Sequence, residues 1–257
     1  YSGVRFRWRV IADVGGTQGT FRVDDVRVTM QAVHDLAAVS LRYIPTVPTE
    51  QDSIVAFARV KNVGLSAATS FQVDFYNDLN NDSLPQPNER IVSTSHPVLL
   101  AVSDSVEVSA SLGLFPPGLG LIMGQVTYPP DQNALNDRTR SSLHVSYRSH
   151  SVVINEIMYA PTNNEPEWVE LYNTRSDSID LEDWLISDNV VTTRRTISVS
   201  PVVIPPRTFV VLAKDSSALV DVHPDVPSRV VHLPSLPTLN NAGDAVVVYD
   251  NASVTMD

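Results

Sequence analysis

Apolar and polar residues alternate along most of this chain, as at Phe71, Val73 and Phe75, which stand at every second position. Successive side chains of a β-strand point to opposite faces, so a period of two is typical of strands with one buried face. Valine- and isoleucine-rich runs recur about every 8 to 12 residues, separated by clusters of Pro, Gly, Asn and Asp. We therefore predict a nearly all-β chain of antiparallel, layered sheets rather than alternating strands and helices.

One short segment has a different pattern. Asp215 or Ser216 suits the N-cap of a helix, and Ala218, Leu219 and Val220 follow within one turn. We expect a short helix in residues 215–221 that serves as a crossover turn.

The composition excludes several classes of protein. Of the 257 residues, 43% are hydrophobic and 18% are charged, which is typical of a folded chain rather than a disordered one. The chain has no cysteine, so disulfides, cysteine zinc sites and thiol nucleophiles are excluded. Acidic residues outnumber basic residues by 29 to 18, and a net charge of -11 repels phosphate groups on average. We therefore expect no nucleic-acid partner.

The apolar runs and the first residues were compared with the patterns of membrane-spanning helices and leader segments. No apolar stretch approaches the roughly 20 residues that span a bilayer as a helix, so direct membrane insertion is not expected. The chain begins at Tyr1 with a strand-like run instead of a leader pattern. We interpret it as a piece of a longer protein, and no pattern in it predicts an oligomeric state.

Turn clusters divide the chain into three segments. Residues 1–33 contain the run Val4–Val10, a turn at Gly15–Gly16 and the run Thr20–Val28, which together predict a β-hairpin. The end of this segment, around Phe21, resembles the last strands of a jelly-roll domain of the lectin or protease-associated type.

The remaining segments, residues 34–149 and 150–257, each carry enough strands for a sandwich of their own. The predicted fold is therefore all-β, with tandem β-sandwiches after an N-terminal β-hairpin fragment.

The middle segment, residues 34–149, has an ordered series of motifs. A valine-rich strand leads into Asn62-Val63-Gly64, then Phe71–Tyr76, and later Asp131-x-Asn133-x-x-Asn136-Asp137 before a final strand. This order is similar to that of the bacterial cell-adhesion-related domain, which is an immunoglobulin-like module.

The last segment, residues 150–257, contains a longer series of motifs. In order, these are Ile154–Tyr159, Glu167–Asn173, Asp180–Asp188, Phe209–Leu212 and Leu239–Asp244. The series resembles the lamin-tail domain in its bacterial form, which has an immunoglobulin-like sandwich. Together the two resemblances imply a large secreted or surface-attached bacterial protein, in which such modules space, display or attach other domains.

The most specific candidate binding site is a polar loop, residues 78–89. Oxygen-bearing side chains stand at positions 1, 3, 5 and 12 of this loop, which are Asp78, Asn80, Asp82 and Glu89. With the Leu84 carbonyl at position 7 and a water or Gln86 at position 9, they match the hard oxygen ligands that calcium requires. The loop is therefore a candidate calcium site, and calcium is the candidate cofactor.

Other features of the loop favour a simpler interpretation. Ser83 stands at position 6, where a calcium loop uses glycine, Pro85 stands at position 8, and the flanking segments are strands rather than helices. The alternative is a polar hairpin in which Asp and Asn bond nearby amides. A second polar cluster, residues 131–137, is interpreted as a turn before the last strand, with cation binding as the weaker alternative.

We assign no catalytic residue. The six histidines form no paired metal motif, and neither a nucleophile elbow nor a phosphate-binding loop occurs. Glu156, Glu165, Glu167 and Glu170 would suit a two-carboxylate hydrolase only if two of them met in a cleft, which nothing in the sequence indicates. Solvated strand faces are the preferred interpretation of these glutamates.

The predicted function is therefore non-catalytic. We expect a structural, adhesive or domain-displaying segment whose partner is a protein or glycan at a cell surface, with one loop stiffened by calcium. The alternative is an accessory carbohydrate- or substrate-binding module of a multidomain hydrolase, which requires aromatic side chains exposed on one surface. A hydrolase that uses Glu156 and Glu170 is a further alternative.

Overall fold

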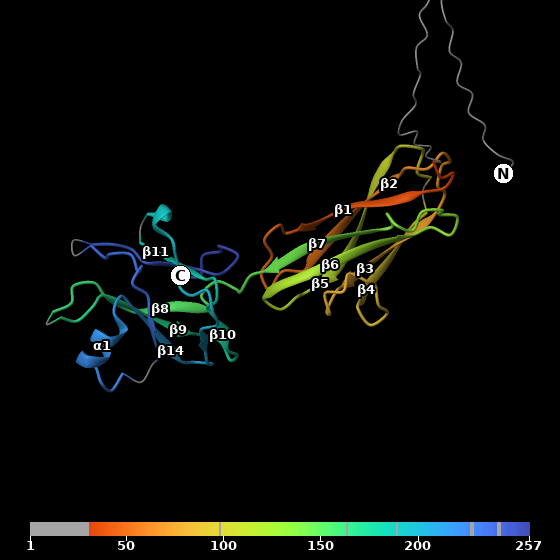
Figure 1. The fold of residues 1–257 in the computed structure, drawn as a ribbon. Coiled ribbons are helices and arrows are strands. Elements are labelled where there is room, and N and C mark those ends of the chain that lie inside the picture. Colours follow the sequence, from red (N-terminus) through yellow and green to blue (C-terminus); the bar gives the residue numbers. More distant parts are fainter. Residues whose placement is uncertain (1–30, 98, 163, 189, 227–228, 241–242) are drawn as a thin grey trace, which may run out of the picture.

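The computed structural model describes residues 31–257, except residues 98, 163, 189, 227–228 and 241–242. The hairpin predicted for residues 1–33, with its jelly-roll resemblance, lies outside the described residues apart from positions 31–33. Figure 1 shows the described chain as two bodies of β-structure that follow one another along the sequence.

The first body is a sandwich of two sheets. Its strands are β1 (Leu36–Ile44), β2 (Ile54–Asn62), β3 (Phe71–Asn77), β4 (Arg90–His96), β5 (Ser105–Gly113), β6 (Gly118–Thr127) and β7 (Arg138–Val145). One sheet has the order β1-β2-β5 and the other has the order β4-β3-β6-β7. All of these neighbouring strands are antiparallel, as the alternating pattern predicts.

The core of the first body follows from the period of two. Alternate residues of β2 from Ile54 to Val60 are buried, while the residues between them are more exposed. Val73 and Phe75 of β3 belong to the same hydrophobic core from the other sheet. Burial of these side chains from both sheets is the main source of the stability of the sandwich.

The second body is also built almost entirely of strands. These are β8 (Val152–Met158), β9 (Trp168–Asn173), β10 (Ile179–Asp180), β11 (Leu185–Ser187), β12 (Arg195–Thr196), β13 (Val203–Ile204), β14 (Phe209–Ala213), β15 (Arg229–His232) and β16 (Val247–Tyr249), with the helical segments η1 (Val191–Thr193) and α1 (Ser216–Val222). The sheets have the orders β15-β14-β9-β8, β12-β11-β16 and β10-β13.

One strand pair of the second body corrects the prediction of a wholly antiparallel chain. β14 and β15 are parallel, with Val211 opposite Val230. Parallel neighbours cannot be joined by a tight turn, so the chain crosses over between them through α1. The predicted short helix is therefore present. Asp215 is its N-cap, and the Asp215 side chain accepts hydrogen bonds from the amides of Ser217 and Ala218.

The core of the second body lies on one face of β9. Val169 and Leu171 point into this core and are fully buried, as alternation along the strand predicts. Trp184 is also fully buried there and is the largest side chain of this core. The chain is thus all-β, with tandem immunoglobulin-like sandwiches. Among the described residues, no helix combines the length and the apolar character needed to span a membrane.

Candidate functional site

The candidate calcium loop, residues 78–89, connects β3 to β4. Its ends are buried, since Asp78 and Glu89 are each only 3% exposed. The Asn77 amide donates to the Glu89 carbonyl at 2.9 Å, and the Asp78 amide donates to the Leu121 carbonyl of β6 at 2.9 Å. These bonds hold both ends of the loop against the sheet, while its tip, including Leu84, is exposed.

Side-chain oxygens inside the loop accept hydrogen bonds from its own amides. Asp78 accepts from the amides of Asp82 and Ser83, at 3.2 and 2.9 Å. Asn80 accepts from the Asp82 amide at 3.0 Å, and Asp82 accepts from the Leu84 amide at 2.7 Å. This is the behaviour expected of Asp and Asn in a polar turn.

Ser83 explains how the loop forms without the usual glycine at position 6. Its φ is 60°, in the left-handed region that glycine adopts without strain. Asn81 has a φ of 57° in the same turn. The chain therefore makes the sharp turn that the spacing requires, at the cost of some backbone strain at a serine.

Glu89, at position 12, has one oxygen without a partner. Its Oε1 accepts a hydrogen bond from the Leu79 amide at 3.0 Å, whereas Oε2 is buried and unpaired. An unpaired buried carboxylate oxygen is costly, because nothing replaces the water that it has lost. Of the predicted ligands, Asp78 and Glu89 lie together at the base of the loop.

Asp82 and Asn80 lie at the exposed tip instead. The Asp82 carboxylate accepts hydrogen bonds from the side-chain amides of Gln86, at 2.8 Å, and Asn80, at 3.0 Å. No group of three or more His, Cys, Asp or Glu side chains in the described part of the chain is arranged around a common metal position. Binding of an ion would thus require Asp82 to turn away from Gln86.

The second polar cluster forms a turn that leads into β7, as predicted. Asp131 accepts hydrogen bonds from the amides of Asn133, at 2.8 Å, and Leu36, at 2.7 Å. Asp35 also belongs to this cluster, since it accepts a hydrogen bond from the Asn136 side chain at 2.8 Å. It lies far from the cluster in sequence, and the amide of Ala38, in β1, donates to the Asn136 carbonyl at 2.9 Å, which holds the two segments together.

Asp137 is a member of this cluster whose charged form is unfavourable. Burial, together with the nearby charges of Asp131 and Asp35, raises the pKa of Asp137 to about 6. Its Oδ1 is buried without a hydrogen-bond partner. These conditions favour the neutral acid over the carboxylate.

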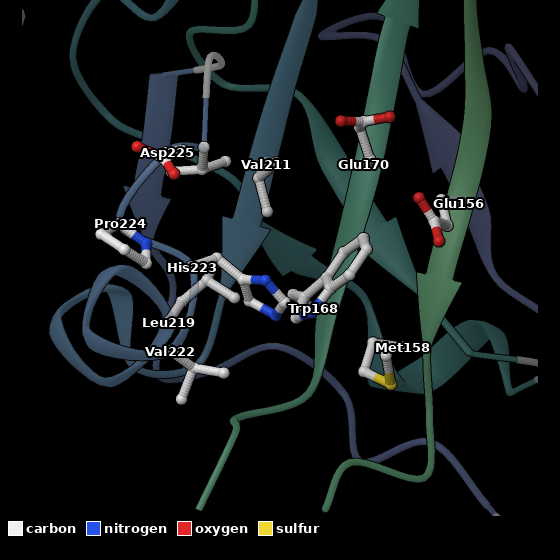
Figure 2. A pocket seen from close by; sticks show the side chains of 11 residues that line it. Glu156, Met158, Trp168, Glu170, Val211, Leu219, Val222, His223, Pro224 and Asp225 are labelled. Carbon is white, nitrogen blue, oxygen red and sulfur yellow. The ribbon is translucent and has the colours of Figure 1, made fainter.

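The second body contains a cavity of about 570 Å³ on the outer face of its four-stranded sheet. Figure 2 shows Trp168 and Val211 in the middle of this cavity, with Glu156 and Glu170 on one side and Asp225 on the other. Glu156 and Glu170 are directly opposite residues of β8 and β9. The structure therefore brings together in one cavity the two glutamates that the hydrolase alternative names, although no pattern in the sequence indicates that they meet.

A β-bulge explains why alternation could not reveal this pair. The register of β8 and β9 shifts between Ile154 and Glu156, so that Asn155 is an extra residue. The shift places Glu156 beside Glu170 on the outer face, because residues after a bulge change sides relative to a regular strand.

Trp168 is held in the cavity wall by a network of polar contacts. Its Nε1 donates to Glu165 Oε1 at 2.9 Å, and His223 Nε2 lies 2.8 Å from the same oxygen. The hydrogen bond from Trp168, and then the contact with His223, lower the pKa of Glu165. Trp168 is 9% exposed and Trp184 is fully buried, so neither tryptophan offers the open aromatic platform expected of a carbohydrate module.

Comparison with known families identifies the second body. Residues 146–257 match the family model of the lamin tail domain. This match includes the segment 150–257, and it confirms the resemblance found in the sequence. No curated protein matches the chain.

Several solved structures are similar to this chain. One is the crystal structure of the CARDB domain of a Pyrococcus furiosus protein in complex with di-metal ions, with 16% identity and a TM-score of 0.35 over 49% of this chain and 99% of that domain. A solution structure of the same domain has 18% identity and a TM-score of 0.33, over 46% and 98% of the two chains. Red sea bream transglutaminase has 13% identity and a TM-score of 0.35, and the match covers 72% of this chain and 26% of that chain.

Proposed function

We propose that this chain, in which residues 146–257 form a lamin tail domain, is a non-catalytic spacer in a larger secreted or surface-attached protein. Its role is to hold and display neighbouring domains at a fixed separation. The observation that carries this proposal is the direct joint between the two bodies, where residues 146–151 connect β7 to β8. A flexible linker would let the two bodies move independently, whereas a joint bridged by side chains restrains them.

Ser146 is bound to both bodies at once. Its amide donates to the Pro48 carbonyl at 2.8 Å, and its carbonyl accepts from the Glu50 amide at 2.9 Å. The Ser146 hydroxyl donates to Asp250 Oδ2 in the second body, and the residue is only 1% exposed. Rotation about the connection would break these bonds inside a site that excludes water.

An ion pair between Glu50 and Arg175 bridges the same joint. Their side chains are only 17% and 13% exposed. The Arg175 guanidinium also donates to Asp177 at 2.9 and 3.0 Å, and it lies 5.4 Å from the centre of the Tyr147 ring. A partly buried, hydrogen-bonded ion pair has a more defined geometry than an exposed pair, which contributes little.

A distance measurement between spin labels tests the rigid joint. The chain has no cysteine, so Ser93→Cys and Ser217→Cys place one label on an exposed site of each body. We expect a single narrow distance distribution for the otherwise unchanged chain. Arg175→Gln should at least double its width, because it removes the charge that pairs with Glu50.

Arg42→Gln is the matched control. It breaks an ion pair with Glu107, at 2.6 Å, that lies within the first body. This variant should leave the distribution unchanged. A distribution that is already broad before any arginine is replaced would contradict the spacer proposal.

A second function is favoured by the unpaired Glu89 oxygen. We propose that the loop of residues 78–89 binds calcium through Asp78, Asn80, Asp82, the Leu84 carbonyl and Glu89. A calcium ion at the base of the loop would satisfy Glu89 Oε2, which is buried without a partner. It would also fix the exposed tip of the loop to the end of the first sandwich.

Thermal unfolding with and without calcium tests this site. Binding to the folded state stabilises it by about 2.7 kcal/mol at a hundred times the dissociation constant, so Tm should rise by several degrees. Glu89→Gln should abolish this rise, and Asp104→Asn, at an exposed site of the same body, should retain it. An equal rise with Glu89→Gln, or no rise in the unchanged chain, would exclude calcium binding by this loop.

A further inference from the structure

We infer that the cavity between β8, β9, β14 and α1 binds an arginine side chain presented by a partner protein. The cavity lies on the outer face of the second body, where Glu156 and Glu170 stand beside an apolar floor (Figure 2). This site goes beyond the spacer role, because rigid spacing of domains requires no ligand here.

The two glutamates repel each other in the free protein. Like charges at directly opposite positions of an antiparallel pair destabilise the sheet. Asn155 Nδ2 donates to Glu170 Oε1 at 2.7 Å, and among the described residues no Lys, Arg or His forms an ion pair with Glu156 or Glu170. A cation placed between the two carboxylates would remove this repulsion.

Basic side chains of the same region are already engaged elsewhere. Lys214 Nζ lies 2.5 Å from Glu167 Oε2, and His223 is paired with Glu165. Asp225 adds a third carboxylate across the cavity from the glutamates (Figure 2). The cavity therefore has an unmatched negative charge that its own body does not neutralise.

The floor of the cavity fits the apolar part of an arginine. Trp168, Val211 and Leu219 form a small hydrophobic cluster on the outer face of the sheet, and Met158 packs against it. The aliphatic stem of an arginine can lie on such a surface while its charged end reaches the carboxylates. The volume exceeds that of one side chain, so the flanking residues of the partner also have room.

The arrangement of the carboxylates favours arginine over lysine. A guanidinium is planar and carries five donors, so it can bond two neighbouring carboxylates at once. A lysine ammonium is a compact, strongly hydrated charge that lacks this fork. The site thus presents two neighbouring carboxylates beside an apolar floor, which suits an arginine, the residue type enriched at binding hot spots.

Titration of the full chain with a short peptide tests this site. The probe is acetyl-Gly-Arg-Arg-Gly-amide, and the observed signal is the indole N–H of Trp168, assigned by its loss in Trp168→Phe. We expect this signal to move and saturate with the arginine peptide. The citrulline peptide, which keeps the shape but not the charge, and the lysine peptide should each bind at least tenfold more weakly.

Two double variants distinguish binding at this site from nonspecific attraction to the negative charge of the chain. Glu156→Gln with Glu170→Gln should weaken binding of the arginine peptide at least tenfold. Glu182→Gln with Asp183→Asn removes the same number of charges elsewhere in the second body, and should change the affinity less than twofold. Equal losses in both variants, or equal binding of the lysine or citrulline peptide, would overturn the inference.

The stability of the glutamine variant provides an independent readout. Without peptide, its Tm should equal or exceed that of the unchanged chain, because the replacement removes the repulsion between the glutamates. Weaker binding then cannot be attributed to unfolding. A lower Tm would show that the carboxylates stabilise the sheet by themselves, and it would contradict the argument for an unmatched pair.

Discussion

Asn62 and Asn173 make the same set of hydrogen bonds in the two bodies. Each is the last residue of a strand, β2 or β9, and each is fully buried. Each side-chain oxygen accepts from the amide two residues later, at 3.0 Å in Asn62 and 2.8 Å in Asn173. Each side-chain amide donates to the carbonyl four residues later, at 2.9 Å in both. In both sandwiches, a buried asparagine therefore ends a strand and holds the following turn through the same two hydrogen bonds.

Replacement of either asparagine by aspartate should destabilise its body strongly. In Asn173→Asp, a carboxylate oxygen would face the carbonyls of Asp177, Ile204 and Pro205, which now receive the side-chain amide. Loss of these bonds and burial of an unpaired charge should cost about 3 kcal/mol or more. Calorimetry should show a lower Tm for the second body.

Hydrogen exchange provides the control for this prediction. Asn62→Asp should increase exchange in the strands of the first body, and Asn173→Asp in those of the second. The reverse pattern, or an equal effect of both variants throughout the chain, would contradict separate roles for the two asparagines.

Gly64 is required by a close approach of two backbone segments. A Cβ atom at this position would lie 2.7 Å from the Asp35 amide nitrogen and 2.8 Å from the Val33 carbonyl oxygen. Backbone atoms cannot move aside as a side chain can, so we expect Gly64→Ala to cost about 2 kcal/mol in urea unfolding. Gly120→Ala is the control. Its Cβ would meet no atom closer than 3.8 Å, and its stability should be unchanged or slightly higher.

The helix α1 should depend on its N-cap. Asp215 Oδ1 accepts hydrogen bonds from the amides of Ser217 and Ala218, both at 3.0 Å. Asp215→Ala should lower stability by about 1 kcal/mol, as other N-cap replacements do. Asp215→Asn keeps an acceptor oxygen and should recover most of that loss. If both variants have the same Tm, the charge of Asp215 matters rather than its hydrogen bonds.

Alternation along the strands predicted most of the fold, because it reports which side chains are buried. Val169 and Leu171 point into the core as expected, and so do alternate residues of β2. Alternation does not report the direction of pairing. The parallel pair of β14 and β15 was therefore missed, although the helix between them was predicted from the capping residue Asp215.

The sites were harder to predict, because they depend on residues far apart in the chain. Asp78 and Glu89 belong to one loop, so their spacing alone predicted that they meet. Glu50 and Arg175 are 125 positions apart, and only the folded joint brings them together. Glu156 and Glu170 meet because of a bulge at Asn155, which no feature of the local sequence indicates.

Asp137 should make the stability of the first body depend on pH. Its pKa is raised from 3.8 to about 6 in the folded state, chiefly by burial and then by the charges of Asp131 and Asp35. A raised pKa means that the folded state binds the proton more tightly than the unfolded state. This contribution to stability is fully present below about pH 4, and it is lost as the pH rises through about 6.

Asp137→Asn removes the titrating group, so it should be more stable than the unchanged chain at pH 7. We expect a difference of roughly 1 kcal/mol, because water screens a partly exposed carboxyl and reduces the effect of the full shift. The difference should vanish near pH 4 in urea unfolding. Asp177→Asn should have the opposite sign, since hydrogen bonds from Arg175 lower the pKa of Asp177. An Asp137→Asn chain that is less stable than the original at pH 7 would show that the carboxylate is a favourable partner in this cluster.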